Sequence, residues 1–95
     1  MAELATPEHL KVKNAERAVL GSIFLDAQVF DLINEILSPE DFHAPKHQLI
    51  FQSMRILSGR SLGINLISVI EALQQEGVME DVGGESYIFG EFGVS

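Results

Sequence analysis

Apolar residues return at helical spacing in four stretches of the chain, separated by short segments that contain Gly, Pro, Asn or Asp. In the first stretch, apolar positions three to four residues apart would lie on one face of a helix. Asn14 precedes this stretch, and its side-chain amide oxygen suits the free amides of a first helical turn. We therefore predict a helix over residues 14–26, preceded by a flexible amino-terminal arm over residues 1–13, where no period is sustained.

The second stretch begins after Asp26, which can cap a helix that runs to about Leu37. Residues 38–41 (SPED) then combine a capping serine, a proline and two acids. This combination predicts one short helical turn that presents Phe42 to the core.

The third stretch opens with Pro45 and ends near Ser58, and Gly59 stands where a left-handed residue commonly follows a helix. Its apolar residues occupy more than one face, so this helix is expected to be buried on more than one side.

The fourth stretch has a start signal at Asn65 and an end signal at Gly77. After it, the Gly83-Gly84 pair predicts a corner before a last helical segment that contains Tyr87.

No region alternates apolar and polar residues between hairpin turns, so strands are not expected. The predicted fold is all-α: a compact orthogonal helical bundle with little or no strand, forming one helical head domain over residues 14–95. The predicted core consists of the apolar residues at helical spacing together with Tyr87: Val19, Leu20, Ile23, Phe24, Phe30, Ile33, Phe42, Ile50, Phe51, Met54, Val69, Ile70, Leu73 and Tyr87.

Composition narrows the class of protein. A hydrophobic content of 46% in 95 residues fits a single small domain. The sequence has no cysteine, which excludes disulfides, thiolate zinc ligands and cysteine nucleophiles. Residues 1–11 lack the apolar run of a signal peptide, and no segment approaches the roughly 20 apolar residues of a membrane span. We expect a cytoplasmic protein without membrane contact.

The formal charge of −8 is unevenly distributed, because residues 61–95 contain no Lys or Arg. Strong duplex binding needs clustered cations, so the charge disfavours it. An acidic surface often serves solubility alone, and docking of a basic partner is the sharper interpretation. On charge, the candidate partner surface comprises Glu71, Glu76, Glu80 and Asp81.

His43 and His47 have the spacing of two metal ligands on one helix face. Pro45 lies between them and is expected to start the helix, so the two imidazoles would not share a face. Glu40 and Asp41 are the further ligands nearby, whereas zinc normally takes three or four well-placed ones. We predict no metal site, with His47 packed or capping at a helix start and His43 in a loop.

Catalytic motifs are missing from the sequence. None of the serines lies in a nucleophile elbow, and Gly83-Gly84 lacks the GxxxxGK[ST] pattern of a phosphate-binding loop. We therefore predict no catalytic residue and no cofactor-binding residue in this chain.

Four segments, in order, resemble the amino-terminal domain of bacterial replicative DNA helicases of the DnaB type. They are residues 16–26 (ERAVLGSIFLD), 37–42 (LSPEDF) with 47–51 (HQLIF), 65–73 (NLISVIEAL) and 82–88 (VGGESYI). Each segment is mainly helix, cap and core, and the specificity lies in the set, which covers residues 12–88. Gly90 and Glu91 depart from the family pattern, which puts the helix after Tyr87 in doubt.

The resemblance implies a non-catalytic collar of a hexameric, ATP-driven ring that unwinds DNA at the replication fork. The implied partners are other copies in the ring, primase and the helicase loader, with DNA bound by the motor. The pairing hairpin, the linker and the ATPase motor, with its ATP and Mg²⁺, would lie beyond Ser95. The competing interpretations are the helicase-binding domain of primase and a small acidic regulatory or helix-turn-helix DNA-binding protein unrelated to replication.

Overall fold

The computed structural model describes the backbone of residues 2–93 and the side chains of Val12 and of residues 14–93. All regular structure in this part is helical, in agreement with the all-α prediction. The five α-helices are α1 (Ala2–Leu25), α2 (Val29–Ile36), α3 (Pro45–Gly59), α4 (Leu66–Gln75) and α5 (Gly84–Phe92). Short 3-10 turns, η1 (Pro39–Asp41) and η2 (Glu80–Val82), lie before α3 and α5.

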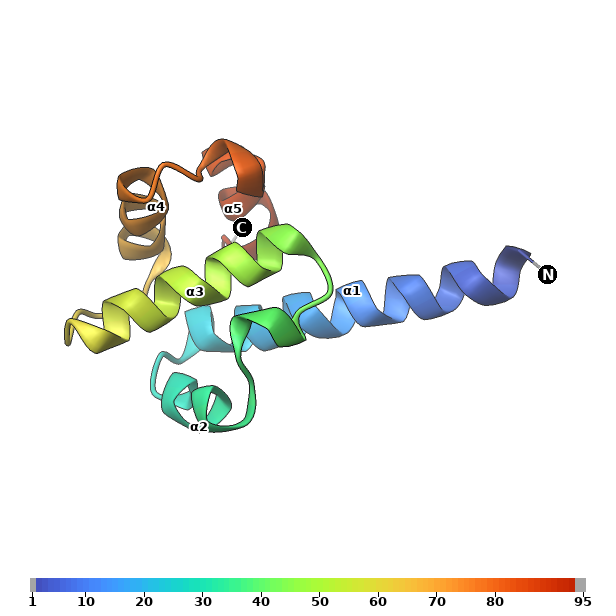
Figure 1. Ribbon diagram of the computed structural model, residues 1–95, viewed down its shortest axis with the longest axis horizontal. Coiled ribbons are helices and arrows are strands. Elements are labelled where there is room, and N and C mark those ends of the chain that lie inside the picture. The colour runs from blue at the N-terminus through green and yellow to red at the C-terminus, as the bar shows by residue number, and fades with distance from the viewer. Residues whose placement is uncertain (1, 94–95) are drawn as a thin grey trace.

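Helix α3 lies at the centre of the bundle and contacts α1, α4, η1 and η2 (Figure 1). Helix α4 crosses its direction steeply, and α5 returns toward α1. Phe51 of α3 is fully buried, with its ring centroid 5.4 Å from that of Phe30 and 5.0 Å from that of Phe42. The three rings join α2, the segment after η1 and α3 in one core. Every residue predicted as core is either buried in this cluster or packed against it.

The predicted start of the first helix at Asn14 is wrong. Helix α1 begins at Ala2 and includes Asn14. Residues 2–13 are rich in Ala, Leu, Glu and Lys, which favour helix through their own propensity and need no apolar period to do so. The amino-terminal half of α1 extends beyond the other helices, and the molecule measures 47 × 28 × 27 Å.

The cap predicted at Asp26 is confirmed only in part, whereas the turn predicted after α2 is confirmed. The backbone N–H of Gln28 donates to Oδ1 of Asp26 (3.1 Å), but α2 itself begins only at Val29. The turn at residues 38–41 forms as predicted, with the Ser38 N–H donating to Oδ2 of Asp41 (2.8 Å).

Gly59 does not take the predicted left-handed conformation, because α3 includes it. The helix ends later, and Ser61 has the positive φ of 57°. The N–H of Leu62 then donates to the carbonyl of Leu57 (2.9 Å), which is the bonding pattern of a Schellman motif.

The remaining helix signals match the structure. Oδ1 of Asn65 accepts the N–H of Ser68 (2.9 Å) at the start of α4. Gly77, Gly83 and Gly84 have φ values of 74°, 98° and 81°, which residues with a side chain rarely adopt. Helix α5 continues through Gly90 to Phe92, so the departure from the family pattern does not interrupt it.

Within the described residues, no helix combines the length and the apolar character that crossing a membrane requires.

Candidate functional site

Glu16 is a buried acid, 8% exposed, which α1 places against the start of α3. The backbone N–H of His43 donates to its Oε2, and that of Ala44 donates to its Oε1 (3.2 Å). Ala44 stands at the N-cap of α3 and has no side-chain acceptor, and Pro45 has no N–H to satisfy. The carboxylate from α1 therefore caps the entrance of α3 from a distance, and it also suits the positive end of the helix dipole.

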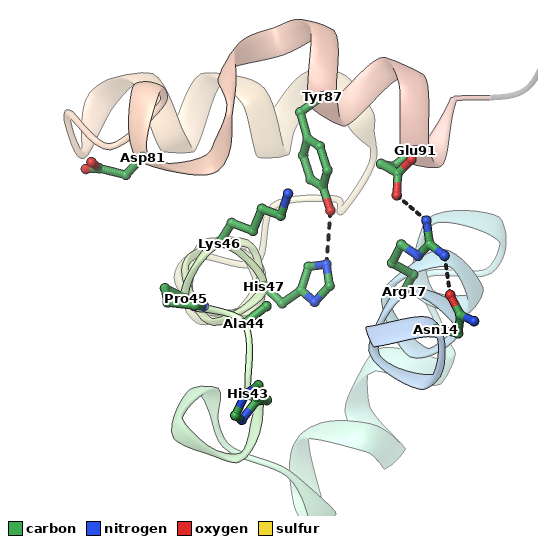
Figure 2. Close-up of a pocket in the computed structure, with 10 residues that line it drawn as sticks. All are labelled: Asn14, Arg17, His43, Ala44, Pro45, Lys46, His47, Asp81, Tyr87 and Glu91. Atoms are coloured by element: carbon green, nitrogen blue, oxygen red, sulfur yellow. Dashed lines mark hydrogen bonds and ion pairs between the residues drawn. The ribbon is translucent and has the colours of Figure 1, made fainter. Parts of the chain in front are cut away.

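His47 links Glu16 to Tyr87. Its Nδ1 lies 2.8 Å from Oε1 of Glu16. Its Nε2 lies 3.0 Å from the hydroxyl of Tyr87 (Figure 2). A carboxylate only accepts hydrogen bonds, so Nδ1 carries a proton. Nε2 then accepts from the Tyr87 hydroxyl when the ring is neutral, and donates to it when the ring is protonated. In both states, one imidazole connects α1, α3 and α5.

The environment shifts the pKa of both oxygen acids. Burial raises the pKa of Glu16, but hydrogen bonds from His47 and from the amides of His43 and Ala44 outweigh it, so the pKa is lowered overall. For Tyr87, burial and then the nearby Glu91 raise the pKa, against a smaller opposing effect of Arg17. Glu16 is therefore ionised and Tyr87 protonated at neutral pH.

A cavity of about 580 Å³ opens beside this network, between α1, the start of α3, η2 and α5 (Figure 2). Its two cations both have partners within the molecule. Nη1 of Arg17 lies 2.7 Å from Oε1 of Glu91, and a second nitrogen of Arg17 donates to Asn14. Nζ of Lys46 lies 3.9 Å from the centre of the Tyr87 ring, a cation–π geometry.

The arrangement supports structural linkage rather than catalysis. A carboxylate that orients an imidazole also occurs in catalytic triads, where the imidazole activates a nucleophile. Here the second ring nitrogen faces a protonated phenol, and the side chains of His47 and Glu16 are only 2% and 10% exposed. The network therefore holds three helices together.

The two histidines considered as metal ligands do not converge. His47 contacts Glu16 and Tyr87. His43 precedes α3 and lies apart from the His47 ring in the view of the cavity (Figure 2). The acids considered with them belong to η1, where Asp41 accepts from Ser38. No group of three or more His, Asp or Glu side chains that could hold a metal ion occurs in the described part of the chain.

The four acids proposed as a partner surface are all exposed. Glu71 lies in α4 and lines a hollow that also involves α3, while Glu76 follows the end of that helix. Glu80 and Asp81 belong to η2, and Asp81 lines the cavity next to α5. Glu71 and Asp81 thus line two different hollows, and the structure does not gather the four acids in one site.

Sequence reasoning missed Glu16 as an interacting residue. The available signal was an unmet requirement: α3 starts at Pro45, and its N-cap residue Ala44 has no side-chain acceptor for the amides at that point. Such a start calls for an acceptor from elsewhere in the fold.

Comparisons with known proteins agree with this fold and with the motifs. Residues 8–90 match the family model described as the DnaB-like helicase N-terminal domain. The replicative DNA helicase DnaC of Bacillus subtilis is 40% identical over 74 residues, which is 78% of this chain and 16% of that protein. The replicative DNA helicase DnaB of Haemophilus influenzae is 39% identical over 87 residues, which is 92% of this chain and 18% of that protein.

A solved structure shows the same fold. The crystal structure of the N-terminal domain of DnaB helicase from Mycobacterium tuberculosis matches with a TM-score of 0.77 at 29% identity, over 82% of this chain and 56% of that one. The chain spans less than a fifth of the length of the two helicases named above. The matched segments, the helical fold and this structural likeness together show that the chain belongs to the family of DnaB-like helicase N-terminal domains.

Proposed function

We propose that the chain is the non-catalytic collar and partner-docking domain of a replicative DNA helicase, which as a whole unwinds DNA at the replication fork using ATP. The observation that carries the proposal is the family match over residues 8–90, together with the fold of a helicase amino-terminal domain. In this proposal the protein works in the bacterial or phage replication complex in the cytoplasm. ATP and Mg²⁺ belong to a motor domain, because the chain has no GxxxxGK[ST] motif.

A collar domain has to keep its fold while the helicase ring operates and partners bind and dissociate. The Glu16–His47–Tyr87 network suits that task, because it fixes α1, α3 and α5 to one another through buried groups. The proposed partners are other copies of the chain within a hexameric ring, primase and the helicase loader. The relatives named above are helicases, which favours this proposal over the helicase-binding domain of primase.

Calorimetric titration of the chain with purified primase from the same organism tests the docking part. We expect saturable binding with a defined stoichiometry. Absence of heat at concentrations up to about 0.1 mM, which is above the range of most specific complexes, would contradict docking of primase.

The genomic sequence beyond codon 95 tests whether the chain is part of a helicase. An open reading frame that continues into GxxxxGK[ST] supports a helicase collar. A stop codon at that point contradicts it and favours a small independent protein.

A further inference from the structure

Helix α2 (Val29–Ile36) is apolar on two sides, and only one of them is covered. Phe30 is buried against Phe51, whereas Leu32 and Ile36 have exposed fractions of 64% and 78%. Residues four apart on a helix are neighbours, so these two side chains form an apolar row one turn long. Figure 1 shows α2 at the edge of the bundle, with α1 and α3 on one side of it.

An acidic row runs beside the apolar one. Asp31 and Glu35 are also four residues apart, and both are exposed. Residues 18–45 contain no Lys or Arg. Among the side chains that the structure describes, neither Asp31 nor Glu35 has a salt-bridge partner. The outer side of α2 therefore presents apolar surface and unneutralised negative charge next to each other.

We propose that this α2 face, made of Asp31, Leu32, Glu35 and Ile36, docks a basic amphipathic helix of a partner protein. The apolar side chains of the incoming helix cover Leu32 and Ile36, and its Lys or Arg residues lie along Asp31 and Glu35. The inference rests on the docking part of the proposed function and names the surface and the chemistry of the partner.

Charge selects this occupant over a second copy of the chain. The chain carries a formal charge of −8, and pairing two α2 faces would bring both acidic rows into one interface. Like charges facing each other across an interface oppose association, whereas a basic helix neutralises the row and is steered toward it.

The test uses a fluorescein-labelled helical peptide of about 18 residues, long enough to form helix, with Leu along one face and Lys beside it. Fluorescence anisotropy measures its binding to the intact chain over a range of salt concentrations. A matched peptide with Glu in place of every Lys, and a scrambled peptide of the same composition, serve as controls. We expect binding of the amphipathic Leu–Lys peptide only, and weaker binding at higher salt.

Variants locate the binding surface. The Leu32→Gln/Ile36→Gln double variant should weaken binding by about tenfold or more, because the contacts at the centre of an interface dominate affinity. The matched control is Ile67→Gln/Phe89→Gln, at side chains that are 59% and 47% exposed elsewhere on the molecule, and it should change binding less than about twofold. Circular dichroism and thermal melting confirm that each variant is folded.

Charge is tested in the same way. Asp31→Asn/Glu35→Gln should weaken binding and reduce its dependence on salt, whereas Glu71→Gln/Glu76→Gln should leave both unchanged. Equal effects of the two pairs, or a larger effect of the second, would overturn the proposal. So would a self-association that sedimentation detects and that Leu32→Gln/Ile36→Gln abolishes, because the occupant would then be a second copy.

The outcome is separable from that of the proposed function. If primase binds to the chain but the Leu–Lys peptide binds the α2 variants as tightly as the natural chain, this inference alone fails. If the peptide discriminates them but primase does not bind, the docking of primase alone fails.

Discussion

Oε1 of Glu16 lies 2.8 Å from Nδ1 of His47, and this contact joins α1 to α3 across 31 residues of sequence. The same carboxylate accepts the amides of His43 and Ala44. One side chain therefore caps a helix, orients an imidazole and, through that imidazole, holds the hydroxyl of Tyr87 on α5. Removing it affects all three helices at once.

Glu16→Gln should lower the free energy of unfolding by about 1.5–3 kcal/mol, the range for hydrogen bonds to a charged group. The amide of glutamine retains the size of the carboxyl, but its NH₂ faces donors where an acceptor is required. Urea unfolding measures the loss. Glu35→Gln, at an exposed residue of α2, is the matched control and should change stability by less than about 0.5 kcal/mol. Equal losses for the two variants would contradict the capping role.

The contribution of Glu16 should depend on pH in the acid range. Its pKa in the folded chain lies below the ordinary value of 4.5, so the unfolded chain takes up the proton first as the pH falls. The stabilisation is fully present above about pH 4.5 and is lost as the pH falls toward the folded-state pKa. The stability difference between the natural chain and Glu16→Gln should therefore shrink as the pH falls below 4.5. A difference that stays constant down to pH 3 would mean that folding does not lower the pKa of this carboxyl.

Phe51→Ala should destabilise the domain by about 3–5 kcal/mol, because it removes a fully buried ring between Phe30 and Phe42. Chemical denaturation of the two proteins measures the change. The control is Phe89→Ala, at a ring that is 47% exposed, for which we expect a loss below about 1 kcal/mol. A loss under about 1 kcal/mol at Phe51 would show that the ring does not fill the core.

The elements that could be predicted from the sequence are those whose signals act within a few residues. The Asn65 cap bonds to Ser68, three residues ahead, and the turns at Gly77 and Gly83 depend on the backbone of single residues. Core positions could also be predicted, because helical spacing alone places apolar side chains on one face. Family membership followed from several such local segments in order.

The Glu16–His47–Tyr87 network could not be predicted, because its members are 31 and 40 residues apart and meet only through the packing of three helices. A local sequence signal also does not show whether the folded chain uses it. Asn14 has the chemistry of a cap, yet the helix passes through it, and its amide oxygen accepts from Arg17 instead. Gly59 has the freedom for a left-handed turn, but the chain makes that turn at Ser61.

The two asparagines allow a direct comparison of a used and an unused cap. Asn65→Ala should cost about 1 kcal/mol, because the amide of Ser68 loses its acceptor at the start of α4. Asn14→Ala should change stability by less than about 0.5 kcal/mol, since Ala favours the helix interior and the lost partner is an exposed arginine. Thermal melting of both variants gives the order. A larger loss of stability for Asn14→Ala than for Asn65→Ala would indicate that Asn14 does cap the start of a helix.

Gly21→Ala should stabilise the domain by about 1 kcal/mol. Gly21 lies in the interior of α1, and a methyl group at this position would meet no atom within 4 Å outside its own helix. Alanine therefore adds helix propensity without a clash. Gly77→Ala is the matched control: the space there is equally open, but the φ of 74° is unfavourable for any side chain, so we expect a loss of about 1–2 kcal/mol. If Gly21→Ala destabilised the domain as well, another helix would have to lie closer to α1 in solution than it does in this structure.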